Sequence, residues 1–143
     1  MLMRGLSDMI KRKKEIFQMN EIIHTDKAPA ALGPYSQAVK AGNLLFVSGQ
    51  VPIDPATGAM VENDITVQTR QSLTNVSAIL EKAGYSCADV VKTTVLLSDI
   101  ANFTPMNEVY ATFFKENCPA RACFAVKDLP KGALVEIEVI ASK

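Results

Sequence analysis

Apolar and polar residues alternate along several short stretches of the chain, and a period of two residues is typical of β-strands. The clearest stretch, Leu134–Ala141, is apolar at positions 135, 137 and 139 and places Glu136 and Glu138 between them. Because successive side chains of a strand point to opposite faces, we expect the apolar side to cover a core and both glutamates to lie on the other face. We predict further strands at Glu21–Asp26, Ser36–Lys40, Leu44–Ser48, Val90–Leu97 and Ala120–Val126.

Two other stretches repeat apolar residues at a period near 3.6, which predicts helices. The first follows Asp64, a residue suited to an N-cap, and runs to about Ala83, where Gly84 occupies the position of a C-terminal cap. The second has Thr104 as its expected N-cap and Pro105 in its first turn, and it continues as an apolar face to position 114.

The expected order is therefore about three strands, a helix, a strand, a helix and two strands. This order predicts a single α+β domain with one sheet and helices on one face. A chain of 143 residues buries roughly two thirds of its surface on folding, so the core needs neither disulfides nor a metal. Two helices cover only one face of such a sheet, so the face with the glutamates has to stay in water or meet another subunit.

Charge divides the chain into two parts. Residues 1–18 carry five basic and two acidic residues, net +3, whereas residues 19–143 carry ten basic and thirteen acidic residues, net −3. We interpret residues 1–18 as an N-terminal extension, either mobile or a short helix that docks on a partner, and residues 19–143 as the domain. A negative domain is a poor binder of nucleic acid, because that affinity comes mostly from neutralising phosphates.

Several classes of function are disfavoured by composition. No apolar run is long enough to span a membrane, and no glycine-rich phosphate loop or metal-ligand spacing occurs, so we expect neither a cofactor nor a metal. Three cysteines, an odd number, argue against a disulfide scaffold and for a reducing compartment, which we take to be the cytoplasm. The one histidine, His24, is expected to be an ordinary surface residue.

Arg121 is the strongest candidate for chemistry. It begins a predicted strand among small and apolar neighbours, and its planar fork matches a carboxylate or phosphate in a two-point contact. The alternative is a structural salt bridge to Glu136 or Glu138 on an adjacent strand. Cys123 shares a strand face with Arg121, so it could be a thiol activated by the guanidinium or, more commonly, a small packing residue.

Tyr35 and Ser48 are polar residues held by turns. Either could be a hydrogen-bonding group in a site, although from spacing alone such residues are more often plain turn residues. Six motifs then occur in an order that resembles the RidA (YjgF) family of reactive imine and enamine deaminases. They are Gly33–Ala38, Leu45–Gln50, Gln71–Asn75, Val91–Val95, Pro119–Cys123 and Val135–Glu138, and the resemblance covers residues 19–143.

The resemblance implies a chorismate-mutase-like fold whose sheets pack into a barrel in a homotrimer, with active clefts between subunits. It implies hydrolysis of 2-aminoacrylate, 2-iminopropanoate and 2-iminobutanoate to 2-keto acids and ammonia without a cofactor. A different class of function also stays open. The same scaffold could bind a metabolite or a protein as a regulatory module, of the kind linked to purine-gene regulation or translation inhibition.

The resemblance also assigns roles to individual residues. It implies that Arg121 binds the substrate carboxylate and that Glu136 holds the attacking water. The positions that it implies line the cleft are Tyr35, Ser48, Gly49, Asn107 and Cys123.

Overall fold

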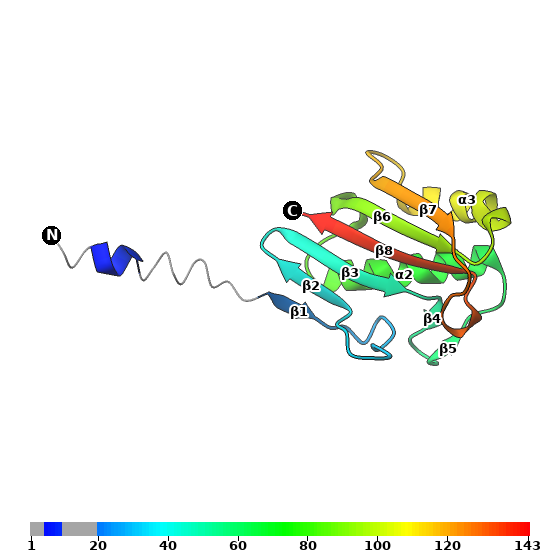
Figure 1. Ribbon diagram of the computed structural model, residues 1–143, viewed down its shortest axis with the longest axis horizontal. Coiled ribbons are helices and arrows are strands. Elements are labelled where there is room, and N and C mark those ends of the chain that lie inside the picture. Colours follow the sequence, from blue (N-terminus) through cyan, green and yellow to red (C-terminus); the bar gives the residue numbers. More distant parts are fainter. Residues whose placement is uncertain (1–4, 10–19) are drawn as a thin grey trace.

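The computed structural model describes residues 5–9 and 20–143, and residues 5–9 form a single helical turn. The predicted N-terminal extension therefore lies mostly outside the described residues and stays a prediction. The remainder is a six-stranded mixed sheet in the order β1-β2-β3-β8-β6-β7, with a separate small hairpin of β4 and β5 (Figure 1). The strands are β1 (Glu21–Ile23), β2 (Ala38–Ala41), β3 (Leu44–Gln50), β4 (Ile53–Asp54), β5 (Ala59–Met60), β6 (Val90–Leu97), β7 (Ala120–Ala125) and β8 (Val135–Ser142).

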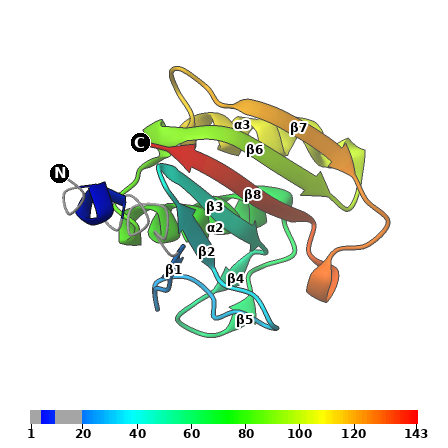
Figure 2. The ribbon, with the colours of Figure 1, turned by 60° about the vertical axis from the view of Figure 1, so that its left-hand side comes forward.

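Two long helices, α2 (Ile65–Lys82) and α3 (Phe103–Phe113), cover the same face of the sheet (Figures 1 and 2). The core lies between them and the sheet, and its members include Leu73, Val76, Ile79, Leu80, Val95, Leu97, Val135 and Ile137, each at most 1% exposed. The α+β prediction is confirmed, with one mixed sheet and both helices on one side. No helix among residues 5–9 and 20–143 is both long and apolar enough to cross a membrane.

The helix ends follow the sequence signals at α2 but not at α3. Asp64 caps α2 by accepting a 2.9 Å hydrogen bond from the Val67 N–H, and Gly84 has the positive φ of 81° expected after a helix. The predicted Thr104 cap is wrong. Asp99 accepts a 2.9 Å hydrogen bond from the Ala101 N–H and starts a 3₁₀ turn that leads directly into α3. Helical geometry is thus established several residues before Thr104.

A β-bulge interrupts the pairing of β3 with β8. Val47 pairs with Val139 and Gln50 pairs with Ile137, so Ser48 and Gly49 together face the single residue between them on β8. A bulge of this kind bends the strand and redirects its side chains. It places Ser48 and Gly49 beside the two glutamates.

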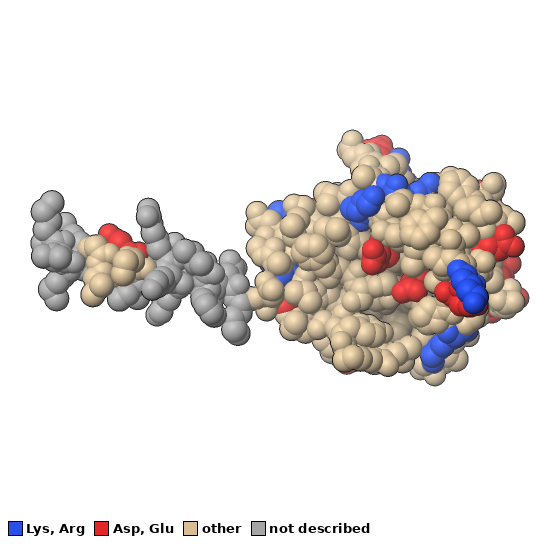
Figure 3. Space-filling view, viewed as in Figure 1, with Lys and Arg blue, Asp and Glu red and all other residues tan. Residues whose placement is uncertain are grey.

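The face of the sheet opposite the helices carries both glutamates, as predicted, because Val135, Ile137 and Val139 fill the core side. An apolar row also crosses this open face. It runs through register partners on four neighbouring strands, Ile22, Val39, Phe46 and Ile140. Phe46 is 43% exposed and Ile22 is 61% exposed. Figure 3 shows this face, with acidic groups beside a hollow in a mostly uncharged surface.

Candidate active site

Arg121 lies on the edge strand β7, on the helix side of the sheet. It pairs with Thr93 of β6, whose buried hydroxyl hydrogen-bonds the Tyr110 hydroxyl of α3 at 2.8 Å. The Arg121 guanidinium carbon lies 4.7 Å from the centre of the Tyr110 ring and 5.5 Å from that of Phe103. Its Nη1 donates a 2.6 Å hydrogen bond to Asn107 Oδ1. Three side chains of α3 therefore contact one guanidinium.

The alternative in which Arg121 pairs with Glu136 or Glu138 is wrong. Strand β6 separates β7 from β8, and the two glutamates point to the opposite face of the sheet. Among residues 5–9 and 20–143, no carboxylate lies within 4.0 Å of the Arg121 guanidinium. A half-buried cation of this kind has its remaining N–H groups available to an external anion.

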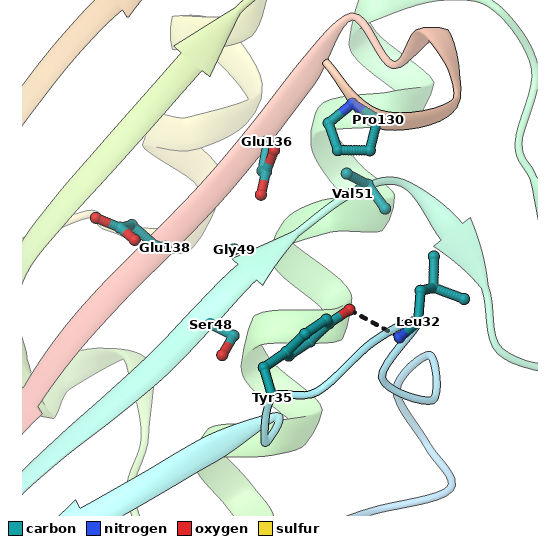
Figure 4. A pocket seen from close by; sticks show the side chains of 8 residues that line it. All are labelled: Leu32, Tyr35, Ser48, Gly49, Val51, Pro130, Glu136 and Glu138. Carbon is teal, nitrogen blue, oxygen red and sulfur yellow. Dashed lines mark hydrogen bonds between the residues drawn. The ribbon is translucent and has the colours of Figure 1, made fainter.

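Glu136 lies in a hollow of about 400 Å³ on the open face. The residues that line this hollow are Leu32, Tyr35, Ser48, Gly49, Val51, Pro130, Glu136 and Glu138. In Figure 4, Leu32, Val51 and Pro130 lie along one side of this space and Ser48 and Glu138 along the other, with Glu136 between them. The hollow thus has an apolar side and a polar side.

Gly49 makes room for the Glu136 carboxyl group. A Cβ atom at position 49 would overlap Glu136 Oε1 and lie 2.9 Å from Glu136 Cδ. The backbone of Gly49 does not have a positive φ, so only the close approach requires glycine here. The bulge and the missing side chain together set the position of the carboxylate.

The pKa of Glu136 is raised above its usual value. Burial is the main cause, because it disfavours the charged carboxylate, and the neighbouring charge of Glu138 adds to the effect. A carboxylate with a raised pKa is a stronger base at neutral pH than an exposed one. Glu136 is therefore suited to take a proton from a bound water.

Tyr35 and Ser48 are fixed by hydrogen bonds to the backbone of the segment between β1 and β2. The Tyr35 hydroxyl accepts a 3.0 Å hydrogen bond from the Leu32 N–H, so its own proton stays available (Figure 4). Ser48 Oγ donates to the Ser36 carbonyl at 2.6 Å. Tyr35, which is 49% exposed, lines the hollow.

Cys123 lies on the helix side of β7, two residues after Arg121, and pairs with Val95. Burial raises the pKa of its thiol, and the opposing effect of the Arg121 charge is the smaller of the two. The thiol is therefore not activated, which favours packing over nucleophilic chemistry. Cys87, Cys118 and Cys123 are all free thiols.

The structure brings the candidate residues together in two groups. Arg121, Asn107 and Cys123 lie where β7 meets α3, whereas Glu136 and the other predicted cleft residues surround the bulge. The two groups lie on opposite faces of the sheet. A single copy of the chain therefore does not place Arg121 beside Glu136.

Buried amides that the sequence patterns did not single out hold the loops around the hollow. Gln37, 2% exposed, accepts from the Thr25 N–H at 2.7 Å and donates to the Pro29 carbonyl at 2.8 Å. Asn75 of α2 donates to the Ile53 carbonyl at 2.9 Å. Gln37 lies in the motif Gly33–Ala38 and Asn75 in the motif Gln71–Asn75. Membership of these motifs is the one feature of the sequence that could have pointed to them. Periodicity cannot find them, because a buried amide looks like a surface residue in the pattern.

No group of three histidine, cysteine, aspartate or glutamate side chains in the described part of the chain is placed to hold a metal ion.

Comparison with known proteins identifies the family. The family model for Endoribonuclease L-PSP proteins matches residues 25–143. The chain belongs to this family, the RidA/YjgF family.

Relatives of known name fall within the same family. A RutC family protein of Pyrococcus horikoshii is 58% identical over 87% of this chain and 99% of its own. The human 2-iminobutanoate/2-iminopropanoate deaminase is 46% identical over 86% of this chain and 90% of its own.

Solved RidA/YjgF structures share the fold. The crystal structure of Escherichia coli TdcF with bound serine matches with a TM-score of 0.83 and 45% identity, covering 86% of this chain and 98% of that one. The Escherichia coli YjgF gene product matches with the same TM-score, 46% identity and the same two coverages. This chain is thus similar throughout its domain to a named deaminase and to a protein seen with a small amino acid.

Proposed function

We propose that the chain hydrolyses reactive 2-imino and 2-enamino acids, such as 2-aminoacrylate, 2-iminopropanoate and 2-iminobutanoate, to 2-keto acids and ammonia. The observation that carries this proposal is the pair of groups described above. Arg121 is a half-buried guanidinium with no carboxylate partner among the described residues, and Glu136 is a carboxyl group in a hollow with a raised pKa. One group suits a small carboxylate, and the other suits a water that attacks a C=N bond.

The active site is proposed to form between two copies of the chain. Arg121 and Asn107 of one copy would complete the hollow that holds Glu136 and Tyr35 of the next. The apolar row on the open face, in which Ile22 and Phe46 are exposed, supports such an assembly, because an uncovered apolar sheet face is costly in water. A closed ring of three copies would bury this face and create three identical sites.

The proposed chemistry needs only positioning and one base. The substrate reacts as its protonated imine, which 2-aminoacrylate forms when its C3 takes a proton from solvent. This imine is an electrophile, and the carboxylates of Glu136 and Glu138 favour its positive charge in the hollow. Water attacks the imine carbon while Glu136 takes one of its protons, which gives a carbinolamine. Glu136 then returns the proton to the nitrogen, and the C–N bond breaks so that ammonia leaves. The hydroxyl proton passes to Glu136 as the C=O bond of the keto acid forms. A base of this kind contributes roughly 10²–10⁴ to the rate.

The hollow also suits a short apolar substrate side chain. Leu32, Val51 and Pro130 form its apolar side, while the proposed water site lies at Glu136. No step in this scheme transfers electrons or requires a carbanion, so we propose that the deaminase works without a cofactor. The three free thiols accord with a reducing compartment, and we propose the cytoplasm.

A regulatory binding module is the second candidate. The bound serine in the related TdcF structure favours it, because that protein holds a small amino acid. Under this proposal the hollow would bind a metabolite without turning it over. A polynucleotide is disfavoured as the ligand, since two carboxylates in the hollow would repel phosphates.

Deaminase activity separates the two candidates. Freshly generated 2-aminoacrylate is supplied to the purified protein, and pyruvate formation is compared among wild type, Arg121→Ala and Arg70→Ala. Arg70 is an exposed arginine on α2 and serves as a matched control. We expect rates well above background for wild type and Arg70→Ala, and a large loss for Arg121→Ala. Equal rates for wild type and Arg121→Ala would contradict the proposal, and binding without turnover would favour the regulatory module.

A further inference from the structure

The neighbours of Arg121 all come from one face of α3. Phe103, Asn107 and Tyr110 are separated by four and three residues, the spacing that places side chains on the same side of a helix. Phe103 and Tyr110 offer ring faces to the guanidinium, and Asn107 Oδ1 accepts from its Nη1. We propose that this face of α3 is a positioning platform that fixes the fork of Arg121 for the substrate carboxylate. The inference rests on the proposed function and deepens it, by naming Phe103 and Tyr110 as positioning residues.

The platform acts through contacts that leave the charge of Arg121 unneutralised. An aromatic face attracts a guanidinium within about 6 Å without forming an ion pair. An amide oxygen orients one N–H group but carries no net charge. A carboxylate at the same position would instead form a salt bridge and compete with the substrate. Neutral partners are therefore what an anion-binding arginine requires.

The platform is itself held rigidly against the sheet. Tyr110 is 7% exposed, and its hydroxyl hydrogen-bonds Thr93, the residue that pairs with Arg121 across the β6–β7 ladder. Thr93 of β6 thus links the two groups: its hydroxyl holds the Tyr110 ring, and its backbone pairs with the backbone of Arg121 on β7. Because two aromatic rings and an amide oxygen already contact the guanidinium, it loses little further freedom when an anion binds.

Asn107 gives the sharpest test, because Asn107→Asp keeps its shape and adds a charge. The new carboxylate would lie at the 2.6 Å contact with Arg121 Nη1 and neutralise it. We expect the affinity for 2-oxobutanoate, the keto acid that 2-iminobutanoate would give, to fall about tenfold or more, since a charged hydrogen bond to the ligand is lost. The KM for the imine should rise by a similar factor, with a smaller change in kcat.

The aromatic contacts are tested by a pair of matched variants. Phe103→Leu removes a ring from the platform, whereas Phe113→Leu makes the same change on the same helix away from Arg121. We expect Phe103→Leu to weaken 2-oxobutanoate binding about threefold to tenfold. Phe113→Leu should leave the affinity unchanged. Thermal unfolding of both variants shows whether their losses of stability are comparable.

A spectroscopic measurement tests the contacts between Arg121 and the two rings without relying on deaminase activity. The Nε–H signal of Arg121 in a ¹⁵N–¹H spectrum, assigned by its loss in Arg121→Lys, should be shifted upfield in wild type by the two ring faces. It should move towards the position of a free arginine in Phe103→Leu and stay in place in Phe113→Leu. An unshifted wild-type signal, or equal effects of the two phenylalanine variants on signal and affinity, would overturn the platform. If wild type binds no 2-oxo acid, the proposed function fails, and this signal alone decides the platform.

Discussion

The carboxyl group of Glu136 occupies the space that a side chain at position 49 would need. A Cβ on Gly49 would overlap Glu136 Oε1, and the bulge at Ser48–Gly49 brings the two strands into this relationship. The backbone of a neighbouring strand thus sets where the proposed base lies.

Gly49→Ala is therefore expected to displace Glu136 and lower kcat by about a hundredfold, because general-base catalysis depends on position. The fold should survive, since the Glu136 side chain can turn towards solvent. Gly33→Ala is the control, because a Cβ there meets only the Tyr35 ring at an ordinary 3.8 Å. Deaminase kinetics with circular dichroism make the comparison. Full activity in Gly49→Ala would show that the position of Glu136 is not critical.

The acid limb of the pH–rate profile should report the raised pKa of Glu136. Activity is expected to rise with pH through that pKa, because only the carboxylate can accept a proton. Glu138→Gln removes the neighbouring negative charge that helps to raise the pKa, so the limb should move to lower pH. If the acid limb of Glu138→Gln lies at the same pH as that of wild type, Glu138 does not contribute to the raised pKa of Glu136.

The same pKa shift predicts an effect on stability. A carboxyl group with a raised pKa in the folded protein is more easily ionised in the unfolded chain, so it costs stability as pH rises from the unfolded to the folded pKa. Glu136→Gln should therefore raise Tm at neutral pH while it lowers kcat by about 10²–10⁴. The gain in Tm should disappear at pH values below the unfolded pKa. A variant that loses stability at neutral pH and keeps its activity contradicts both expectations.

Arg121→Lys separates charge from shape. The lysine keeps the positive charge but loses the planar fork and the contact of the guanidinium with the Tyr110 ring. We expect KM to rise about tenfold or more and kcat to change by a smaller factor. Kinetics with 2-aminoacrylate and calorimetry with 2-oxobutanoate measure the two quantities. An unchanged KM would mean that a point charge suffices.

The open face should mediate assembly. Phe46→Glu places a charge in the apolar row and is expected to give a folded, inactive monomer in sedimentation experiments. Val67→Glu, at another partly exposed apolar position, 37% exposed on α2, should leave the assembly and the activity intact. Wild-type protein that is a stable monomer would remove the basis for a shared site.

Much of the fold could be predicted from local patterns. The alternation around Glu136 and the apolar run of Val90–Leu97 predicted two central strands, and Asp64 marked the start of a helix. Each of these signals depends only on residues close together in the sequence, so it can be detected without knowing the fold. The short β4–β5 hairpin was not predicted, because its strands have only two residues each and lie in a segment rich in turns.

Pairing between distant strands could not be predicted in the same way. Placing β7 beside β6 depends on long-range packing, and it excluded the alternative in which Arg121 pairs with one of the glutamates within the same chain. The recognised motifs supplied the candidate site, but not the rings of Phe103 and Tyr110 that surround Arg121. An aromatic residue on an apolar helix face looks like core until its contact is seen.

Arg121 of one copy and Glu136 of another are proposed to act on the same substrate. Arg121→Ala and Glu136→Gln proteins, each inactive alone, can be unfolded together and refolded as a mixed assembly. Equal mixing should restore about a quarter of the sites, because an interface then pairs an intact Arg121 with an intact Glu136 from its neighbour. Pyruvate formation near that fraction of the wild-type rate is the predicted result. A mixture as inactive as its components, with mixed assembly verified by mass spectrometry, would contradict the account.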